Sequence, residues 1–179
     1  METEVAKNQF VALYTAEADA VFRYCFVCTS NREVALDLAQ DTFVRFWNSI
    51  TKNETDAANI KNERAFLFTI ARNLIIDWYR KKKSVSLEAL TEGSEESGGS
   101  TMQFSDSSKA DLERLGEARH LMGKIKDIDP IYQQAVYLRF VEDLKPKEIA
   151  DILGESANVI SVHINRGLKQ LRDLAGYAD

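Results

Sequence analysis

Residues 146–172, near the end of the chain, restrict its fold more than any other segment. Pro146 suits the first turn of a helix because its φ is already helical and it has no amide hydrogen to satisfy. Gly154 can end that helix in the left-handed conformation, and Ser156 can cap a second helix directly afterwards. The segment therefore predicts two short helices joined by a tight turn.

Apolar residues at helical spacing give each of these two helices one face toward a core. They are Ile149, Ala150 and Leu153 in the first helix, and Ile160, Ile164, Leu168 and Leu171 in the second. The polar side chains predicted to face outward from the second helix are Asn158, Ser161, His163, Asn165, Arg166 and Lys169. Two ordinary bundle helices are the alternative, but the turn residues favour a helix-turn-helix whose second helix enters the major groove of DNA.

The whole chain is predicted to be nearly all-α. Its 179 residues include two prolines and eight glycines, and few segments alternate apolar with polar residues. This length suits two small domains better than one large one. No apolar run approaches membrane-spanning length, and the first residues lack a basic region followed by an apolar core. We therefore expect a cytoplasmic protein without an export signal and without direct membrane insertion.

The acidic excess of the chain is concentrated in its middle. Residues 1–83 hold 12 basic and 11 acidic side chains, residues 84–108 hold none and 5, and residues 109–179 hold 11 and 12. The middle segment is also rich in Ser and Gly and cannot bury enough apolar surface to order itself. It predicts a flexible acidic linker between helical domains at 1–83 and 109–179. Because neither domain is strongly basic, we expect weak DNA binding without a larger partner.

The first domain contains three stretches with apolar residues at helical spacing. They lie around residues 10–26, around residues 34–47 with Asn31 as the expected cap, and from about Glu63 to Lys82.

The third stretch ends in a basic run at residues 80–83. One explanation of this run is that its cations simply complement the helix dipole. Together with Arg64, Arg72, Trp78 and Tyr79, however, it forms a basic surface interleaved with aromatic rings. That combination suits single-stranded DNA, because bases stack on the rings and phosphates pair with the cations.

Three blocks in this order resemble a known family. They are residues 37–47 (DLAQDTFVRFW), residues 64–83 (RAFLFTIARNLIIDWYRKKK) and the tail motif at 146–172. They look like regions 2 and 4 of a sigma-70-family RNA polymerase sigma factor, and the short two-domain layout resembles the extracytoplasmic-function (ECF) group. The resemblance implies that the first domain binds the clamp of core RNA polymerase and opens the minus-10 element of promoter DNA. It implies that the last domain reads the minus-35 element, and that an anti-sigma factor is a partner.

Matching positions carry the family's polymerase-binding role to Asp37, Gln40, Asp41, Arg45 and Trp47. The first three share one face of a helix, for which a merely solvated acidic face is the alternative. The implied minus-10 DNA-binding residues are Asn59, Lys61, Asn62, Arg64, Arg72, Trp78, Tyr79 and Arg80. Among them, the loop from Thr51 to Asn62 matches the segment that captures an unstacked base of the nontemplate strand.

Residues 156–166 match the helix that enters the major groove at the minus-35 element. The resemblance makes Asn158, Ser161, His163 and Asn165 the candidates for base edges, and Arg166 and Lys169 the candidates for phosphates. The chain departs from the family's common pattern here, because Ser161 and His163 stand where Lys and Arg are frequent. Val159 likewise stands in place of a frequent Thr, so the promoter preference does not carry over.

Cys25 and Cys28 form a C-x-x-C motif, which raises the alternative of a metal site. Zinc needs about four ligands, and both histidines lie far away in the sequence. We therefore expect core cysteines, with no metal and no cofactor. Because the sequence shows no nucleophile triad, phosphate-binding loop or paired-carboxylate pocket, we also expect a protein that is not an enzyme.

Two other functions fit parts of the sequence. A response-regulator-type activator can carry a similar helix-turn-helix, but it needs an α/β receiver with alternating strands before it. A polymerase-binding adaptor could use the acidic helix without touching DNA, but the basic and aromatic third helix argues against it.

Overall fold

The computed structural model describes residues 2–51, 60–89, 120 and 123–176. The chain divides into two compact units, Met1–Gly99 and Ser100–Asp179. All regular structure in the described residues is helical, as the sequence predicted. The domain boundaries predicted at residues 83 and 109 remain predictions, because residues 90–119 lie outside the described part of the chain.

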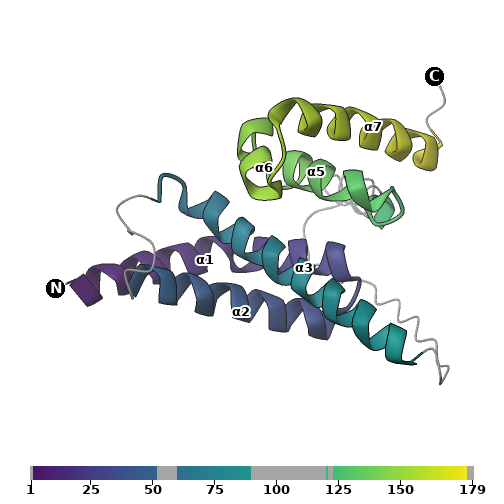
Figure 1. Ribbon diagram of the computed structural model, residues 1–179. Helices are drawn as coiled ribbons and strands as arrows, with labels where there is room; N and C mark the ends of the chain where they lie inside the picture. Colours follow the sequence, from purple (N-terminus) through teal and green to yellow (C-terminus); the bar gives the residue numbers. More distant parts are fainter. Residues whose placement is uncertain (1, 52–59, 90–119, 121–122, 177–179) are drawn as a thin grey trace, which may run out of the picture. The chain divides into compact units, whose positions relative to one another are not determined.

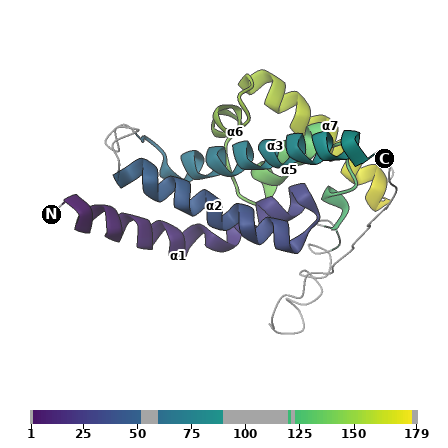
Figure 2. The same ribbon diagram turned by 60° about the horizontal axis from the view of Figure 1, so that its bottom comes forward.

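The first unit is a bundle of three helices (Figure 1). They are α1 (Glu2–Thr29), α2 (Arg32–Thr51) and α3 (Glu63–Ala89). Helices α1 and α2 run antiparallel to each other, and α3 packs against both, as the turned view in Figure 2 also shows. Tyr24 of α1, Phe46 of α2 and Phe68 of α3 are fully buried between them. These three stretches match those expected from the apolar spacing.

Short polar side chains fix where two of these helices begin. The Asn31 side chain accepts a hydrogen bond from the Val34 amide at 3.1 Å, which confirms Asn31 as the cap of α2. In the same way, the Asn62 side chain accepts from the Ala65 amide at 3.0 Å and caps α3. Ser30, between α1 and α2, has a φ of 53°, which turns the chain back on itself.

Helix α3 is longer than the sequence analysis predicted. It continues to Ala89 rather than ending near Lys82, so the first six residues of the predicted linker, 84–89, are helical. Those residues contain no Gly or Pro, and each residue added to an existing helix gains a backbone hydrogen bond. Composition alone therefore placed the end of this helix too early, and residues 90–108 of the predicted linker lie outside the described residues.

The second unit contains α5 (Pro130–Phe140), α6 (Pro146–Leu153) and α7 (Ala157–Ala175). Gly154 ends α6 with a φ of 69°, and the Ser156 hydroxyl accepts a hydrogen bond from the Val159 amide at 3.3 Å. The predicted helix-turn-helix is therefore present, with the predicted residues at its turn. Ile149, Ile152 and Ile160 are buried between the helices.

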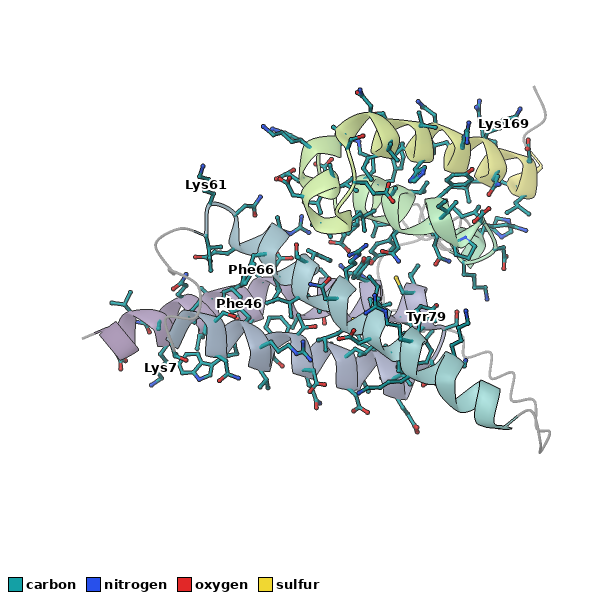
Figure 3. The ribbon with its side chains drawn as sticks, viewed as in Figure 1. Lys7, Phe46, Lys61, Phe66, Tyr79 and Lys169 are labelled. Atoms are coloured by element: carbon teal, nitrogen blue, oxygen red, sulfur yellow. The ribbon has the colours of Figure 1, made fainter. Side chains whose placement is uncertain are left out.

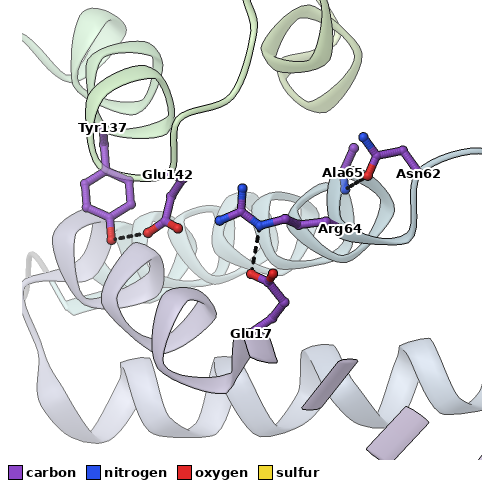
Figure 4. A network of polar contacts seen from close by, with 6 residues as sticks. All are labelled: Glu17, Asn62, Arg64, Ala65, Tyr137 and Glu142. Atoms are coloured by element: carbon purple, nitrogen blue, oxygen red, sulfur yellow. Dashed lines mark hydrogen bonds and ion pairs between the residues drawn. The ribbon is translucent and has the colours of Figure 1, made fainter. Parts of the chain in front are cut away.

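Helix α5 is fixed by a close contact with α7 and by a hydrogen bond to the segment that follows it. A Cβ atom added at Gly167 of α7 would lie 2.4 Å from Cγ2 of Val136 in α5, so the two helices approach closely at this glycine. The hydroxyl of Tyr137, in α5, donates a hydrogen bond at 3.0 Å to the buried carboxylate of Glu142, just after the helix (Figure 4). This bond satisfies a carboxylate that would otherwise be costly to bury.

Candidate functional site

Helix α2 exposes an acidic face made of Asp37, Gln40 and Asp41. The three residues are spaced by three and four positions, so their side chains leave the helix on the same side. Arg45 is exposed one turn further along. Trp47 differs from these four, because it is partly buried and packs edge-on against Phe10 with ring centroids 5.3 Å apart. The structure therefore brings four of the five predicted polymerase-binding residues onto one exposed surface of α2, with Trp47 at its border.

Beside the acidic face lies an apolar hollow of about 530 Å³ between α1 and α2. Its lining residues are Lys7, Phe10, Tyr14, Gln40, Phe43, Val44 and Trp47. Gln40 belongs to both surfaces, and Val44 is 56% exposed. Lys7, at the rim, is labelled in Figure 3. This hollow was not predicted from the sequence, although two pairs of aromatic residues spaced four apart, 10 and 14 on α1 and 43 and 47 on α2, indicate it.

The second half of α3 carries the predicted combination of cations and aromatic rings. Arg80, Lys81, Lys82 and Lys83 are all exposed, and the Lys82 ammonium lies 5.2 Å from the centroid of the Trp78 ring. Tyr79, labelled in Figure 3, is 48% exposed, while its hydroxyl donates a hydrogen bond to the Cys28 carbonyl of α1. Burial raises the pKa of Tyr79 above its usual value. The phenol thus stays protonated, and its bond to α1 fixes the ring beside Trp78.

Arg64, at the start of α3, is bonded within the first unit. Its Nε donates to Oε2 of Glu17 at 2.9 Å (Figure 4). Its guanidinium also lies 5.4 Å from the centroid of the Phe68 ring. Arg64 therefore ties α3 to α1. It also lies about 21 Å along the helix from Trp78. The predicted minus-10 residues consequently separate into one group at the start of α3 and another in its second half, with the partly buried Arg72 between them.

Lys61 and Asn62 belong to the first of these groups, and both are exposed directly before α3. Figure 3 shows Lys61 projecting from this end of the helix. Asn59 lies outside the described residues.

The second helix of the helix-turn-helix, α7, exposes five of the six residues predicted to face outward. They are Asn158, Ser161, Asn165, Arg166 and Lys169. The Ser161 hydroxyl donates to the Ala157 carbonyl at 2.9 Å, so its oxygen is left to act as an acceptor. Along α7, the exposed hydrogen-bonding side chains Asn158, Ser161 and Asn165 come first, and the exposed cations Arg166 and Lys169 follow them toward the C-terminus.

His163 does not face outward, which corrects the prediction for this residue. Its side chain is 12% exposed, and its ring centroid lies 5.4 Å from that of Tyr132 in α5. Its Nδ1 lies 3.3 Å from Oε2 of Glu155, without the geometry of a hydrogen bond. Position 163 comes three residues after Ile160 and four before Gly167, both buried, so the helical period places it at the edge of the core face. In this arrangement His163 packs between helices and does not present its ring to a groove.

Cys25 and Cys28 are buried in the first unit, as predicted for core cysteines. Burial raises the pKa of the Cys25 thiol to about 12 and also raises the pKa of Cys28 above its ordinary value. Both thiols are therefore protonated at neutral pH. Among the described residues, no group of three or more His, Cys, Asp or Glu side chains could hold a metal ion.

Within the described part of the chain, no helix combines the length and the apolar character needed to cross a membrane.

Two family models match the chain. Residues 13–85 match sigma-70 region 2, and residues 124–171 match sigma-70 region 4. The RNA polymerase sigma factor YlaC of Bacillus subtilis (strain 168) is 28% identical over 160 residues, which cover 89% of this chain and 88% of YlaC. The ECF RNA polymerase sigma factor SigM of the same strain is 31% identical over 152 residues, which cover 84% of this chain and 85% of SigM.

Solved structures share the fold. The sigma factor RpoE, in its complex with the anti-sigma factor NepR from Bartonella quintana, matches with a TM-score of 0.75 at 18% identity, over 96% of this chain and 99% of RpoE. CnrH, in complex with the cytosolic domain of CnrY, matches with a TM-score of 0.63 at 20% identity, over 99% of this chain and 96% of CnrH.

Proposed function

The chain belongs to the ECF group of sigma-70-family RNA polymerase sigma factors. We therefore propose that separate surfaces of α2, α3 and α7 bind core polymerase, the minus-10 element and the minus-35 element. As a sigma factor, it is a transcription initiation factor that directs core RNA polymerase to specific promoters. The combination of regions 2 and 4 favours this function over a response-regulator activator or an adaptor.

The acidic face of α2 carries the contact with core polymerase in this proposal. Asp37 and Asp41 offer two exposed carboxylates one turn apart, and Gln40 links them to the apolar hollow. A partner helix with basic and apolar side chains would therefore find charge and apolar surface side by side. Arg45 and Trp47 extend the contact along the same helix. This juxtaposition on α2 is the observation on which the polymerase contact rests.

The minus-10 element is engaged by α3 and the segment before it. Trp78 and Tyr79 supply ring faces, and Arg80 and Arg72 supply cations for the phosphates of an unpaired strand. Lys61, Asn62 and the undescribed Asn59 form the group that captures a single base. Arg64 positions this group, because its bond to Glu17 holds the start of α3 against α1.

The minus-35 element is read by α7. Asn158, Ser161 and Asn165 face the base edges, while Arg166 and Lys169 pair with phosphates. His163 holds α7 in position through its contacts with Tyr132 and Glu155.

Three further parts of the proposal concern the chain as a whole. The segment between the two domains lets both of them engage one promoter at once. The chain acts in the cytoplasm, where core polymerase is found, and catalyses no reaction itself. Because RpoE and CnrH are described in complexes with NepR and CnrY, an anti-sigma factor is proposed as the inhibitory partner here.

The decisive experiment measures binding to core polymerase. The double variant Asp37→Lys and Asp41→Lys places positive charge against a basic partner surface, and binding should weaken by tenfold or more, on the order of the cost of like charges at an interface. Asp19→Lys, at an exposed position on α1, serves as the matched control. Equal binding by the double variant and the control, with helix content unchanged, would remove the polymerase contact from α2.

A further inference from the structure

An apolar residue lies in the middle of the surface that α7 presents to DNA. Residues 158, 162, 165 and 169 follow each other at spacings of four, three and four, so they form one stripe along the helix. The stripe lies opposite the buried Ile160, Ile164 and Gly167. Three of its members are polar, but the second is Val162, which is 45% exposed. The sequence analysis assigned this part of the helix to His163 instead, and that side chain faces the core.

A single exposed valine on a protein surface needs no special explanation. Val162 differs from such a residue by its position, because Asn158 and Asn165 lie on either side of it in the same stripe. If those two amides reach base edges, the side chain between them must also meet the floor of the groove. Val162 has no hydrogen-bonding group, so it can gain affinity there only through apolar contact.

The major groove displays one apolar group, the C5-methyl of thymine. Guanine, cytosine and adenine carry no methyl group there, and an apolar side chain placed over their donors and acceptors leaves those groups without partners. A valine on the groove face therefore favours thymine over the other three bases. The flanking asparagines favour adenine, because their amides can pair with both N6 and N7 of that base.

We propose that Val162 is a specificity-determining residue that contacts the methyl group of a thymine in the upstream promoter element. The inference rests on the proposed role of α7 in reading minus-35. Val162 lies about 6 Å along the helix from Asn158 and about 4.5 Å from Asn165. These distances correspond to one or two steps of about 3.4 Å along a DNA strand. The thymine therefore lies within two base pairs of an adenine read by an asparagine.

Replacing thymine by uracil tests the contact, because the exchange removes the methyl group and keeps the base pair. Holoenzyme reconstituted with core polymerase first selects promoters from a duplex library randomised in the upstream element. Each thymine of the selected element is then replaced by uracil, one at a time. For one thymine, uracil should lower holoenzyme affinity by about fourfold, which is the factor expected for burial of one methyl group.

The protein variants then identify the side chain responsible. Val162→Ala keeps the helix, since Ala has high helix propensity and the position is exposed. This variant shortens the apolar side chain by two methyl groups, so its preference for the thymine promoter over the uracil promoter should be clearly smaller than that of the wild type. Val159→Ala is the matched control, because Val159 is exposed to a similar extent, 41%, but lies on the flank of α7. The control should keep the wild-type preference for thymine.

The possible outcomes separate this inference from the proposed function. If base-pair changes in the upstream element alter wild-type binding but no uracil replacement does, Val162 has no methyl contact and α7 still reads the element. If Val159→Ala lost the preference for thymine and Val162→Ala kept it, the methyl contact would belong to the flank of α7, and the inference would be overturned. If wild-type holoenzyme ignores every base-pair change in the element, the proposed role of α7 itself fails.

Discussion

A single methyl group added at Gly167 should lower the stability of the second unit. An alanine there would bring its Cβ to 2.4 Å from Cγ2 of Val136 and to 3.0 Å from Cβ of Tyr132. The first contact is hard to relieve, because Val136 is fully buried and a β-branched side chain strongly prefers one rotamer in a helix. The second contact requires Cβ of Tyr132 to give way by a few tenths of an ångström, and that atom is attached directly to the backbone of α5. The two helices must therefore move apart.

The expected cost follows from two opposing effects. Alanine is better than glycine in a helix by about 1 kcal/mol. Overpacking a tight core typically costs about 1–3 kcal/mol, and a clash with a Cβ atom belongs at the upper end of that range. We therefore expect Gly167→Ala to lower the free energy of unfolding of the second unit by about 1–2 kcal/mol. Gly123→Ala is the matched control, since nothing lies within 4 Å of its added Cβ.

Hydrogen exchange of the α5 and α7 amides is the appropriate measurement. Both tryptophans, at positions 47 and 78, lie in the first unit, so intrinsic tryptophan fluorescence would not report on the second. Gly167→Ala should speed exchange in α5 and α7, while Gly123→Ala should leave it unchanged or slower. If Gly167→Ala exchanged as slowly as the wild type, the close approach of α5 and α7 would not constrain this position.

Three other predictions concern the linker, the thiols and the DNA contacts. Limited proteolysis should cut first within residues 90–108 and release two helical fragments; earlier cleavage inside α1–α3 or α5–α7 would contradict the division. Because burial raises the pKa of Cys25 to about 12, iodoacetamide should label this thiol at neutral pH only after unfolding. Rapid labelling of the native protein would refute the burial argument. The buried Cys25 thiol should contribute fully to the free energy of unfolding at pH values below the pKa of the unfolded thiol. This contribution should decline as the pH rises toward the pKa of the folded thiol. Arg166→Ala should weaken holoenzyme binding to all promoters alike and reduce its salt dependence, whereas Asn165→Ala should cost about 1–3 kcal/mol on the cognate upstream element and little on variants already changed there. Equal losses for Asn165→Ala on every variant in a minus-35 promoter panel would remove it from the base-reading face.

The fold was largely predictable because local rules determine it. Pro146, Gly154 and Ser156 each have a backbone or capping preference that needs no tertiary information, and the structure places all three as those preferences demand. The end of α3 was not predictable from composition, because the acidic, Ser-rich character of the linker begins before the first helix-breaking residue, Gly93. Helix propagation, and not composition, determines that boundary.

The site was predictable only in part, since exposure depends on tertiary packing. The period of α7 placed Asn158 and Asn165 outward correctly, but polarity was a poor guide for His163, whose ring completes the packing against Tyr132. Polarity also hid Val162, which occupies the outward stripe despite being apolar. In the first unit, the hollow beside α2 needs both α1 and α2 in place before it exists, so no single stretch of sequence could reveal it.

The two opposite faces of α7 have different consequences for evolution. The residues that hold the helix in place, such as Ile160 and Gly167, are all on the core side, whereas the outward stripe is exposed. Substitutions at exposed positions usually change stability by less than about 0.5 kcal/mol. Duplicated copies of such a chain could therefore acquire new upstream elements through changes at 158, 162 and 165 while inheriting the same scaffold. Divergence of promoter sets between paralogues would then require few mutations and no compensating repair of the core.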